Sequence, residues 1–203
     1  MIRRTQGDGN RHGVGMPYMT QEMASILSDI ERETNDATLS QSIYFSPTAI
    51  THIRRLIEMG GTIVTDTTLV ENGIDTSLLG NKGAKVSCFI DEPQVISLAE
   101  QRRITRAEIA VDYGLAITGP KLMVVGSAPA AINRMIRRRQ HEPMSDVCVL
   151  AASTGFASVV QLKEKLIDSD LMSIVVRGKK GGIPLTITIL NAILREVART
   201  NKK

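Results

Sequence analysis

KLMVVGSAPAAINRMIRRRQHEPMSDVCVLAA, residues 121–152, carries the clearest pattern of secondary structure in the chain. Its two ends, 121–127 and 146–152, are largely continuous apolar runs, and residues 128–140 between them have the apolar spacing of a helix. A run that is apolar at nearly every position is typical of a strand buried on both faces of a parallel sheet. The stretch therefore predicts two parallel strands joined by a helix.

The same alternation extends along the chain. Further strand-like runs occupy 62–70, 85–90 and 173–178, and further helical patterns occupy 19–33, 47–59, 94–117, 158–167 and 184–199. This order predicts an α/β fold, a doubly wound, mostly parallel sheet with helices on both faces. For the helix 47–59 we expect Ser46 as the N-cap, Pro47 at the first helical position and Gly60-Gly61 as the end.

Residues 1–17 contain four glycines and predict a flexible N-terminal arm, whereas 18–203 predict a single domain. No apolar run is long enough for a membrane span, and none follows Arg3 and Arg4 as a signal peptide would require, so we expect a cytoplasmic protein.

The composition favours an anionic small ligand over nucleic acid. Aromatic residues make up only 3% of the chain, which leaves little surface for stacking bases, and the net charge of +4 suits an acidic ligand. The basic run 134–141 is interpreted as a solvated helix end, with RNA contact as the alternative. Cys88 and Cys148 are expected to be buried free thiols.

Candidate site residues follow the strands, because ligands of such sheets bind at the carboxyl ends of the strands. The segments that do so are 65–68, 126–129, 153–156 and 177–182, and all are rich in Gly, Ser, Thr or basic residues. The last, RGKKGG, is either an anion-binding turn at a helix N-terminus or a solvated basic turn.

Individual residues in these segments also have two interpretations each. Asp66 either caps a loop or takes part in a site, and Ser127 either caps a helix or lies in a turn that a ligand approaches over Gly126. Thr105 is a candidate helix cap, and Arg106 after it is either a carboxylate fork or a surface arginine. The histidines have no partners at metal-ligand spacing, so no metal site is expected.

Several motifs together resemble the precorrin-8X methylmutase family. They are TIVTDTTLVENGI, ITRAEIAVD, VVGSAPAAI, TGFASVVQLK and RGKKGG followed by LN, and the match covers about residues 20–200. The resemblance implies a doubly wound homodimer that acts in cobalamin biosynthesis. Such an enzyme moves a methyl group between neighbouring carbons at ring C of a tetrapyrrole, precorrin-8 or cobalt-precorrin-8, and needs no separate cofactor.

The family chemistry requires a protein that holds a macrocycle with many carboxylates and supplies a proton. The resemblance implies substrate-binding roles for Thr34, Asp36, Asp66, Thr67, Arg106, Gly126, Ser127, Lys163, Arg177 and Lys180. The pair Phe45-Ser46 aligns the catalytic histidine of the family with Arg32. Arginine stays protonated near neutral pH, so it cannot donate and recover a proton there.

Two functions therefore remain open from the sequence. The first is a methylmutase whose proton comes from another group, such as His12 on the arm or a water held by Arg32. The second is a non-catalytic protein that binds a corrinoid or another tetrapyrrole.

Overall fold

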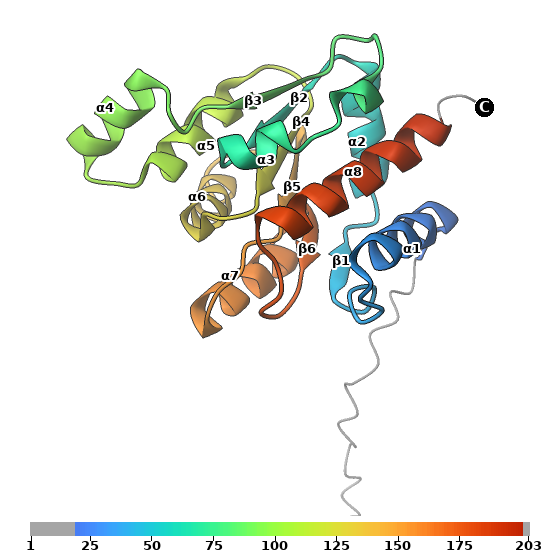
Figure 1. Ribbon diagram of the computed structural model, residues 1–203. Helices are drawn as coiled ribbons and strands as arrows, with labels where there is room; N and C mark the ends of the chain where they lie inside the picture. The colour runs from blue at the N-terminus through green and yellow to red at the C-terminus, as the bar shows by residue number, and fades with distance from the viewer. Residues whose placement is uncertain (1–18, 201–203) are drawn as a thin grey trace, which may run out of the picture.

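The computed structural model describes residues 19–200, so the predicted arm 1–17 and its His12 lie outside the described residues. A six-stranded sheet in the order β1-β6-β5-β4-β2-β3 forms the centre (Figure 1). The strands are β1 (Ile43–Phe45), β2 (Thr62–Thr65), β3 (Lys85–Cys88), β4 (Lys121–Val125), β5 (Val147–Ala151) and β6 (Met172–Val176). All neighbours pair in parallel except β1, which runs antiparallel to β6. The predicted doubly wound α/β fold is confirmed.

Helices cover both faces of the sheet (Figure 1). One face carries α1 (Gln21–Thr34), α2 (Ala49–Glu58), α3 (Thr68–Asn72), the short 3-10 helix η1 (Thr76–Leu79) and α8 (Ile183–Thr200). The other carries α5 (Arg106–Ala116), α6 (Pro129–Arg139) and α7 (Ala157–Asp168), with α4 (Pro93–Arg102) packed against α5. Among residues 19–200, no helix is both long and apolar enough to cross a membrane.

The continuous apolar strands have a direct explanation in this layering. Along β4, Leu122 and Val124 point into the core under α1, α2 and α8, and Met123 and Val125 point into the core under α5, α6 and α7. Because successive side chains of a strand alternate between faces, a strand covered on both sides is apolar at most of its positions.

Two elements predicted from the sequence have the wrong bounds. The strand predicted over 62–70 ends at Thr65, because the Thr67 hydroxyl accepts from the Val70 amide and starts α3. The helix predicted over 94–117 is two helices, separated where Arg103 takes a left-handed conformation and Thr105 forms a capping box with Glu108.

Ser46 is not the N-cap of the second helix, which begins at Ala49 after Thr48. Its hydroxyl instead accepts from the Ser173 amide at 2.8 Å and ties the end of β1 to β6. The predicted end of this helix is confirmed, since it stops before Gly60, whose φ of 68° suits glycine. Cys148 is a buried free thiol as expected, whereas Cys88 is only half-buried.

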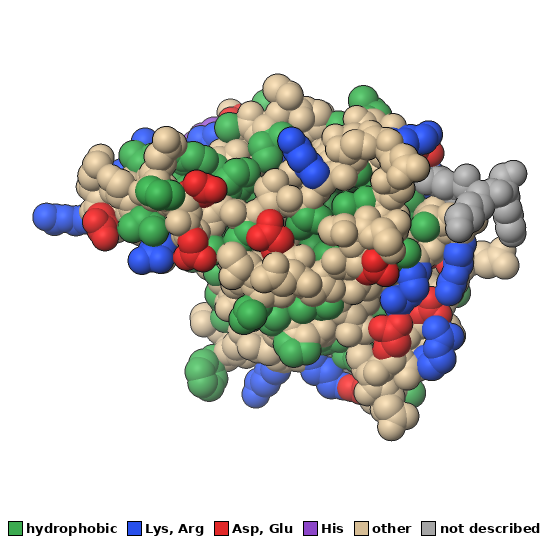
Figure 2. Space-filling view, turned by 45° about the horizontal axis from the view of Figure 1, so that its top comes forward, with side chains coloured by type: hydrophobic (Ala, Val, Ile, Leu, Met, Phe, Trp, Pro, Cys, Tyr) green, Lys and Arg blue, Asp and Glu red, His purple; other side chains and the backbone are tan. Residues whose placement is uncertain are grey.

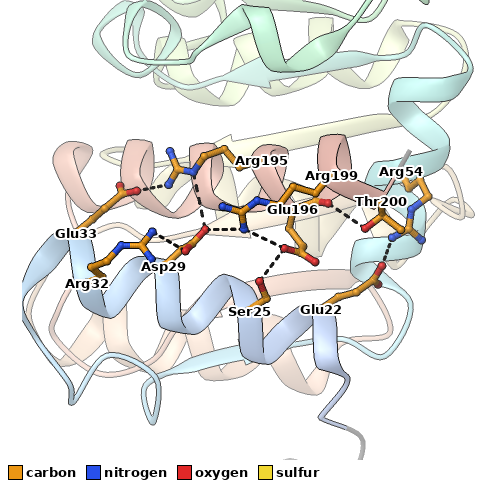
Figure 3. Close-up of polar contacts among 10 residues, drawn as sticks. All are labelled: Glu22, Ser25, Asp29, Arg32, Glu33, Arg54, Arg195, Glu196, Arg199 and Thr200. Carbon is orange, nitrogen blue, oxygen red and sulfur yellow. Dashed lines mark hydrogen bonds and ion pairs between the residues drawn. The ribbon is translucent and has the colours of Figure 1, made fainter. Parts of the chain in front are cut away.

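A layer of ion pairs joins α1 to α8 (Figure 3). The Asp29 carboxylate, 7% exposed, accepts from Arg32 at 2.6 Å and from Arg199 at 3.1 Å. Glu33 pairs with Arg195 in the same layer. Apolar residues of both helices pack beneath these pairs, so the polar groups close the outer side of the α1–α8 seam.

Candidate functional site

The carboxyl ends of β2 and β4 form the point where the strand order reverses, which is the usual ligand crevice of an open α/β sheet. Here the crevice is occupied by the protein itself. The buried Asp66 carboxylate accepts from the amides of Gly126, Ser127 and Ala128 at 3.1, 2.8 and 2.8 Å. The amides that could bind an external anion are therefore already satisfied. Of the two interpretations of Asp66, a loop cap or a site residue, these contacts favour the loop cap.

The turn after β4 is shaped by packing rather than by a side-chain cap. A Cβ atom at Gly126 would lie 2.8 Å from the Thr186 hydroxyl oxygen of α8, so only glycine fits there. The interpretation of Ser127 as a helix cap is wrong, because the N-cap of α6 is Ala128 and no side chain bonds at that position. Pro129 occupies the first turn as expected.

Lys163 links two loops from inside the protein. Its side chain is fully buried, and its ammonium donates to the carbonyls of Ser153 at 3.1 Å and Lys180 at 3.2 Å. Burial lowers the pKa of Lys163, and among the described residues no carboxylate lies within ion-pair distance of it. Lys163 therefore holds the loop after β6 against the loop after β5.

Two of the three cations of the 177–182 turn, Arg177 and Lys180, have carboxylate partners. Arg177 makes a bidentate contact with Glu164, at 3.1 and 2.5 Å, and this contact raises the pKa of Arg177. Lys180 crosses to the loop after α1, where its ammonium lies 2.5 Å from an Asp36 oxygen and 2.5 Å from the Thr38 hydroxyl.

Asp36 is tightly held by its own loop as well. Its second oxygen accepts from the Thr38 amide at 3.0 Å and from the Thr38 hydroxyl at 2.6 Å. The hydrogen bonds from Lys180 and Thr38 lower the pKa of Asp36 to about 2. Asp36 is therefore a carboxylate at any physiological pH.

A pocket of about 540 Å³ lies beside this ion pair, between the C-terminus of α1 and the N-terminus of α8. Its polar lining is Thr34, Asp36, Thr154, Lys180 and Thr188, and its apolar lining includes Leu39, Pro184 and Leu185. A mostly apolar hollow with a few placed polar groups is the usual form of a small-molecule site. This pocket is the candidate site.

The predicted residues divide into those at the pocket and those away from it. Thr34, Asp36 and Lys180 line it, and Lys163 holds the backbone of Lys180 from behind. Within residues 19–200, the lining does not include the residues around Asp66, nor Arg106, nor Arg177. Arg106 starts α5, is 51% exposed and makes only a 3.7 Å contact with Asp91.

Arg32, which the resemblance places at the family histidine position, is absent from the described lining of the pocket. Figure 3 shows its guanidinium beside Asp29. Its side chain is 68% exposed and is held by Asp29 at 2.6 Å. The structure shows Arg32 as a member of the α1–α8 ion layer. It is Thr34, two residues closer to the helix end, that lines the pocket.

Thr38 and Thr188 of this site were not predicted from the sequence. Thr154 lies in the segment 153–156, which the strand-end rule had picked out, so a signal existed for it. Thr38 and Thr188 had no such signal, because their roles depend on how α1 and α8 approach each other across the fold.

The basic end of α6 is largely neutralised. Arg134 pairs with Asp112 at 2.7 Å, Arg138 pairs with Glu142 at 2.7 Å, and Arg139 pairs with Asp170. Over the face shown in Figure 2, acidic and basic side chains of the described residues are intermixed rather than gathered in one basic stripe. These contacts favour the solvated-face interpretation of residues 134–141.

A family model described as precorrin-8X methylmutase matches residues 9–196. The chain belongs to the precorrin-8X methylmutase family. The cobalt-precorrin-8 methylmutase of Salmonella typhimurium is 30% identical to it over 171 residues, which are 84% of this chain and 80% of that protein. The corresponding protein of Methanothermobacter thermautotrophicus is 29% identical over 170 residues, 84% of this chain and 79% of that protein.

A solved structure agrees with this family membership. The precorrin-8x methyl mutase of Thermus thermophilus superposes with a TM-score of 0.78 at 26% identity, covering 90% of this chain and 88% of that one. The fold and the resemblance inferred from the motifs are thus both confirmed for this member of the precorrin-8X methylmutase family.

Proposed function

We propose that this chain is an isomerase of cobalamin biosynthesis that shifts a methyl group between adjacent carbons at ring C of precorrin-8 or cobalt-precorrin-8. Membership of the precorrin-8X methylmutase family over residues 9–196 is the observation that carries the proposal. The chemistry of the pocket beside Lys180 suits such a ligand. Its apolar surface can pack against a macrocycle, and its cation can bind a carboxylate.

The chain's own contribution is to bind and orient the ring. The reaction moves a methyl group within one molecule. A correctly oriented substrate therefore needs only a proton near ring C. Arg32 cannot shuttle that proton, because it remains charged and is held by Asp29. We propose that a water or an acidic group of the substrate itself supplies the proton, and that general acid help worth about 10²–10⁴ in rate is reduced accordingly.

The proposed function also includes an arrangement of the chain into one domain and an assembly of two chains. We propose that residues 18–203 act as one domain, and that the chain works as a homodimer, as the family resemblance implies. The exposed Arg106 on α5 remains a candidate contact for a substrate carboxylate in that assembly, since its only described partner is the 3.7 Å contact with Asp91.

The test is turnover of precorrin-8, followed by absorbance as the product hydrogenobyrinate forms. We expect conversion above the uncatalysed background, and a rise in KM of about twofold to fivefold for Lys180→Met, because an ion pair of the partly exposed Lys180 with a substrate carboxylate is worth at most about 1 kcal/mol. Lys82→Met is the matched control, since Lys82 is exposed and precedes β3 at the opposite edge of the sheet.

Absence of turnover by the wild-type chain, with cobyrinate still bound, would replace this proposal with the non-catalytic corrinoid-binding function. Absence of both turnover and binding would reject both functions.

A further inference from the structure

The one basic side chain in the described lining of the pocket is not free. Lys180 is paired with Asp36, and each is only partly exposed, at 46% and 34% of its side chain. The pair spans two segments that are 144 residues apart in sequence, the loop after α1 and the loop after β6. Any ligand carboxylate that binds Lys180 must therefore compete with a carboxylate of the protein.

Both partners are fixed by contacts independent of the pair itself. Thr38 holds one Asp36 oxygen with its amide and its hydroxyl. Buried Lys163 holds the Lys180 carbonyl at 3.2 Å. These contacts orient the Asp36 carboxylate and hold the Lys180 backbone when the ion pair opens, so Asp36 remains available as a competitor for Lys180.

We propose that Asp36 is a specificity-determining residue, an internal carboxylate that occupies Lys180 until a ligand with several carboxylates displaces it. This inference rests on the proposed function, in which the ligand is a polycarboxylate ring. The resemblance instead implies that Asp36 itself binds the substrate. An anionic ligand, however, gains no binding energy from a second carboxylate beside the same cation.

The energetic argument explains why several carboxylates are needed. Exchanging the Asp36 carboxylate for one ligand carboxylate replaces one partly exposed ion pair by another, and such pairs are worth only ~0–1 kcal/mol. A ligand with a single carboxylate therefore gains almost no affinity at Lys180. A large ring adds apolar burial over Leu39, Pro184 and Leu185 and further carboxylates, and these supply the net affinity.

The experiment compares the wild-type chain with Asp36→Asn. Glu58→Gln is the matched control, because it removes the same charge from an exposed residue at the C-terminus of α2, at the opposite edge of the sheet. Binding of cobyrinate is measured by calorimetry. The reaction of lysine side chains with acetic anhydride is followed by peptide mapping, with exposed Lys179 as the internal reference.

We expect Asp36→Asn to bind cobyrinate about twofold to fivefold more tightly than the wild type, the range that an exposed ion pair supports. Lys180 should be acetylated faster in Asp36→Asn while Lys179 is unchanged, and Glu58→Gln should match the wild type. The gain in affinity should shrink when Lys180→Met is combined with Asp36→Asn, since the effect acts through Lys180.

Weaker or unchanged binding by Asp36→Asn, with a wild-type chain that binds cobyrinate, overturns the specificity role and leaves the proposed function standing. A gain that is undiminished in the Lys180→Met background also overturns it, because Asp36 then acts by general repulsion. Failure of every variant to bind cobyrinate overturns the proposed function, and the specificity role with it.

Discussion

At the scale of single residues, Asp66 determines the geometry of the sheet edge. One buried carboxylate satisfies three consecutive amides of the turn after β4. A strand-end aspartate could be predicted as a loop cap from the sequence. Its partners could not, because Ser127 lies 61 residues further along the chain and is brought near only by the parallel pairing of β2 with β4.

Asp66→Asn is expected to lower the free energy of unfolding by about 2–4 kcal/mol, because an amide nitrogen in place of one oxygen leaves buried amides without an acceptor. Urea unfolding at neutral pH measures the change. Glu58→Gln, at an exposed site, should stay within about 0.5 kcal/mol of the wild type. Equal stability of the two variants would show that the Asp66 contacts are not the main support of the turn.

His52 on α2 makes stability depend on pH. Its imidazole is buried, and its Nε2 lies 3.2 Å from the Lys121 carbonyl, to which it donates in the neutral form. Burial lowers the pKa of His52 below the ordinary value of 6.5. The unfolded chain then binds a proton at this residue at a pH where the folded chain does not.

The free energy of unfolding should therefore keep its full His52 contribution above about pH 6.5 and decline below it, by at most about 1.4 kcal/mol per pH unit, until the folded pKa is passed. Urea unfolding between pH 7 and pH 5 measures this slope. His52→Gln keeps a donor for the Lys121 carbonyl without titrating, so it should be less sensitive to pH over the same range. Identical slopes for both proteins would contradict the assignment.

At the scale of elements, the α1–α8 seam shows what periodicity can and cannot predict. The apolar face of α1 was visible as a helical repeat, and Met23, Ile26 and Ile30 are buried as that repeat requires. The ion layer above it was not predictable, because Asp29 meets Arg199 from the other end of the chain. The strand β1 was missed for a different reason, since a strand of three residues is too short to show a pattern.

The α1–α8 seam contains a buried charge, Asp29, and an exposed one, Arg32, whose contributions to stability should differ. Asp29→Asn should lower the free energy of unfolding by about 1–3 kcal/mol, because it removes the charge of a buried carboxylate that accepts from both Arg32 and Arg199. Arg32→Ala should change it by less than about 0.5 kcal/mol, because Arg32 is 68% exposed. Thermal or urea unfolding of both variants provides the comparison. A larger loss for Arg32→Ala than for Asp29→Asn would reverse this account of the seam.

At the scale of the whole molecule, the fold could be predicted because its main signal is local. Five apolar runs separated by helical patterns are enough to indicate a sheet covered on both faces. The site could be predicted only in part. The strand-end rule selected the edge of the sheet where the pocket lies, and the resemblance supplied Thr34, Asp36 and Lys180, which line that pocket. Which cations are free to bind a ligand depends on pairs across the fold, such as Arg177 with Glu164.

We propose that the carboxyl edge beside Lys180 receives a carboxylate of a corrin ring. A crystal structure of the chain with cobyrinate tests it most directly. We predict a ligand carboxylate within about 2.7–3.2 Å of the Lys180 ammonium, with Asp36 displaced from it and the ring against Leu185 and Pro184. A ring bound elsewhere, with the Asp36–Lys180 pair intact, would contradict the account.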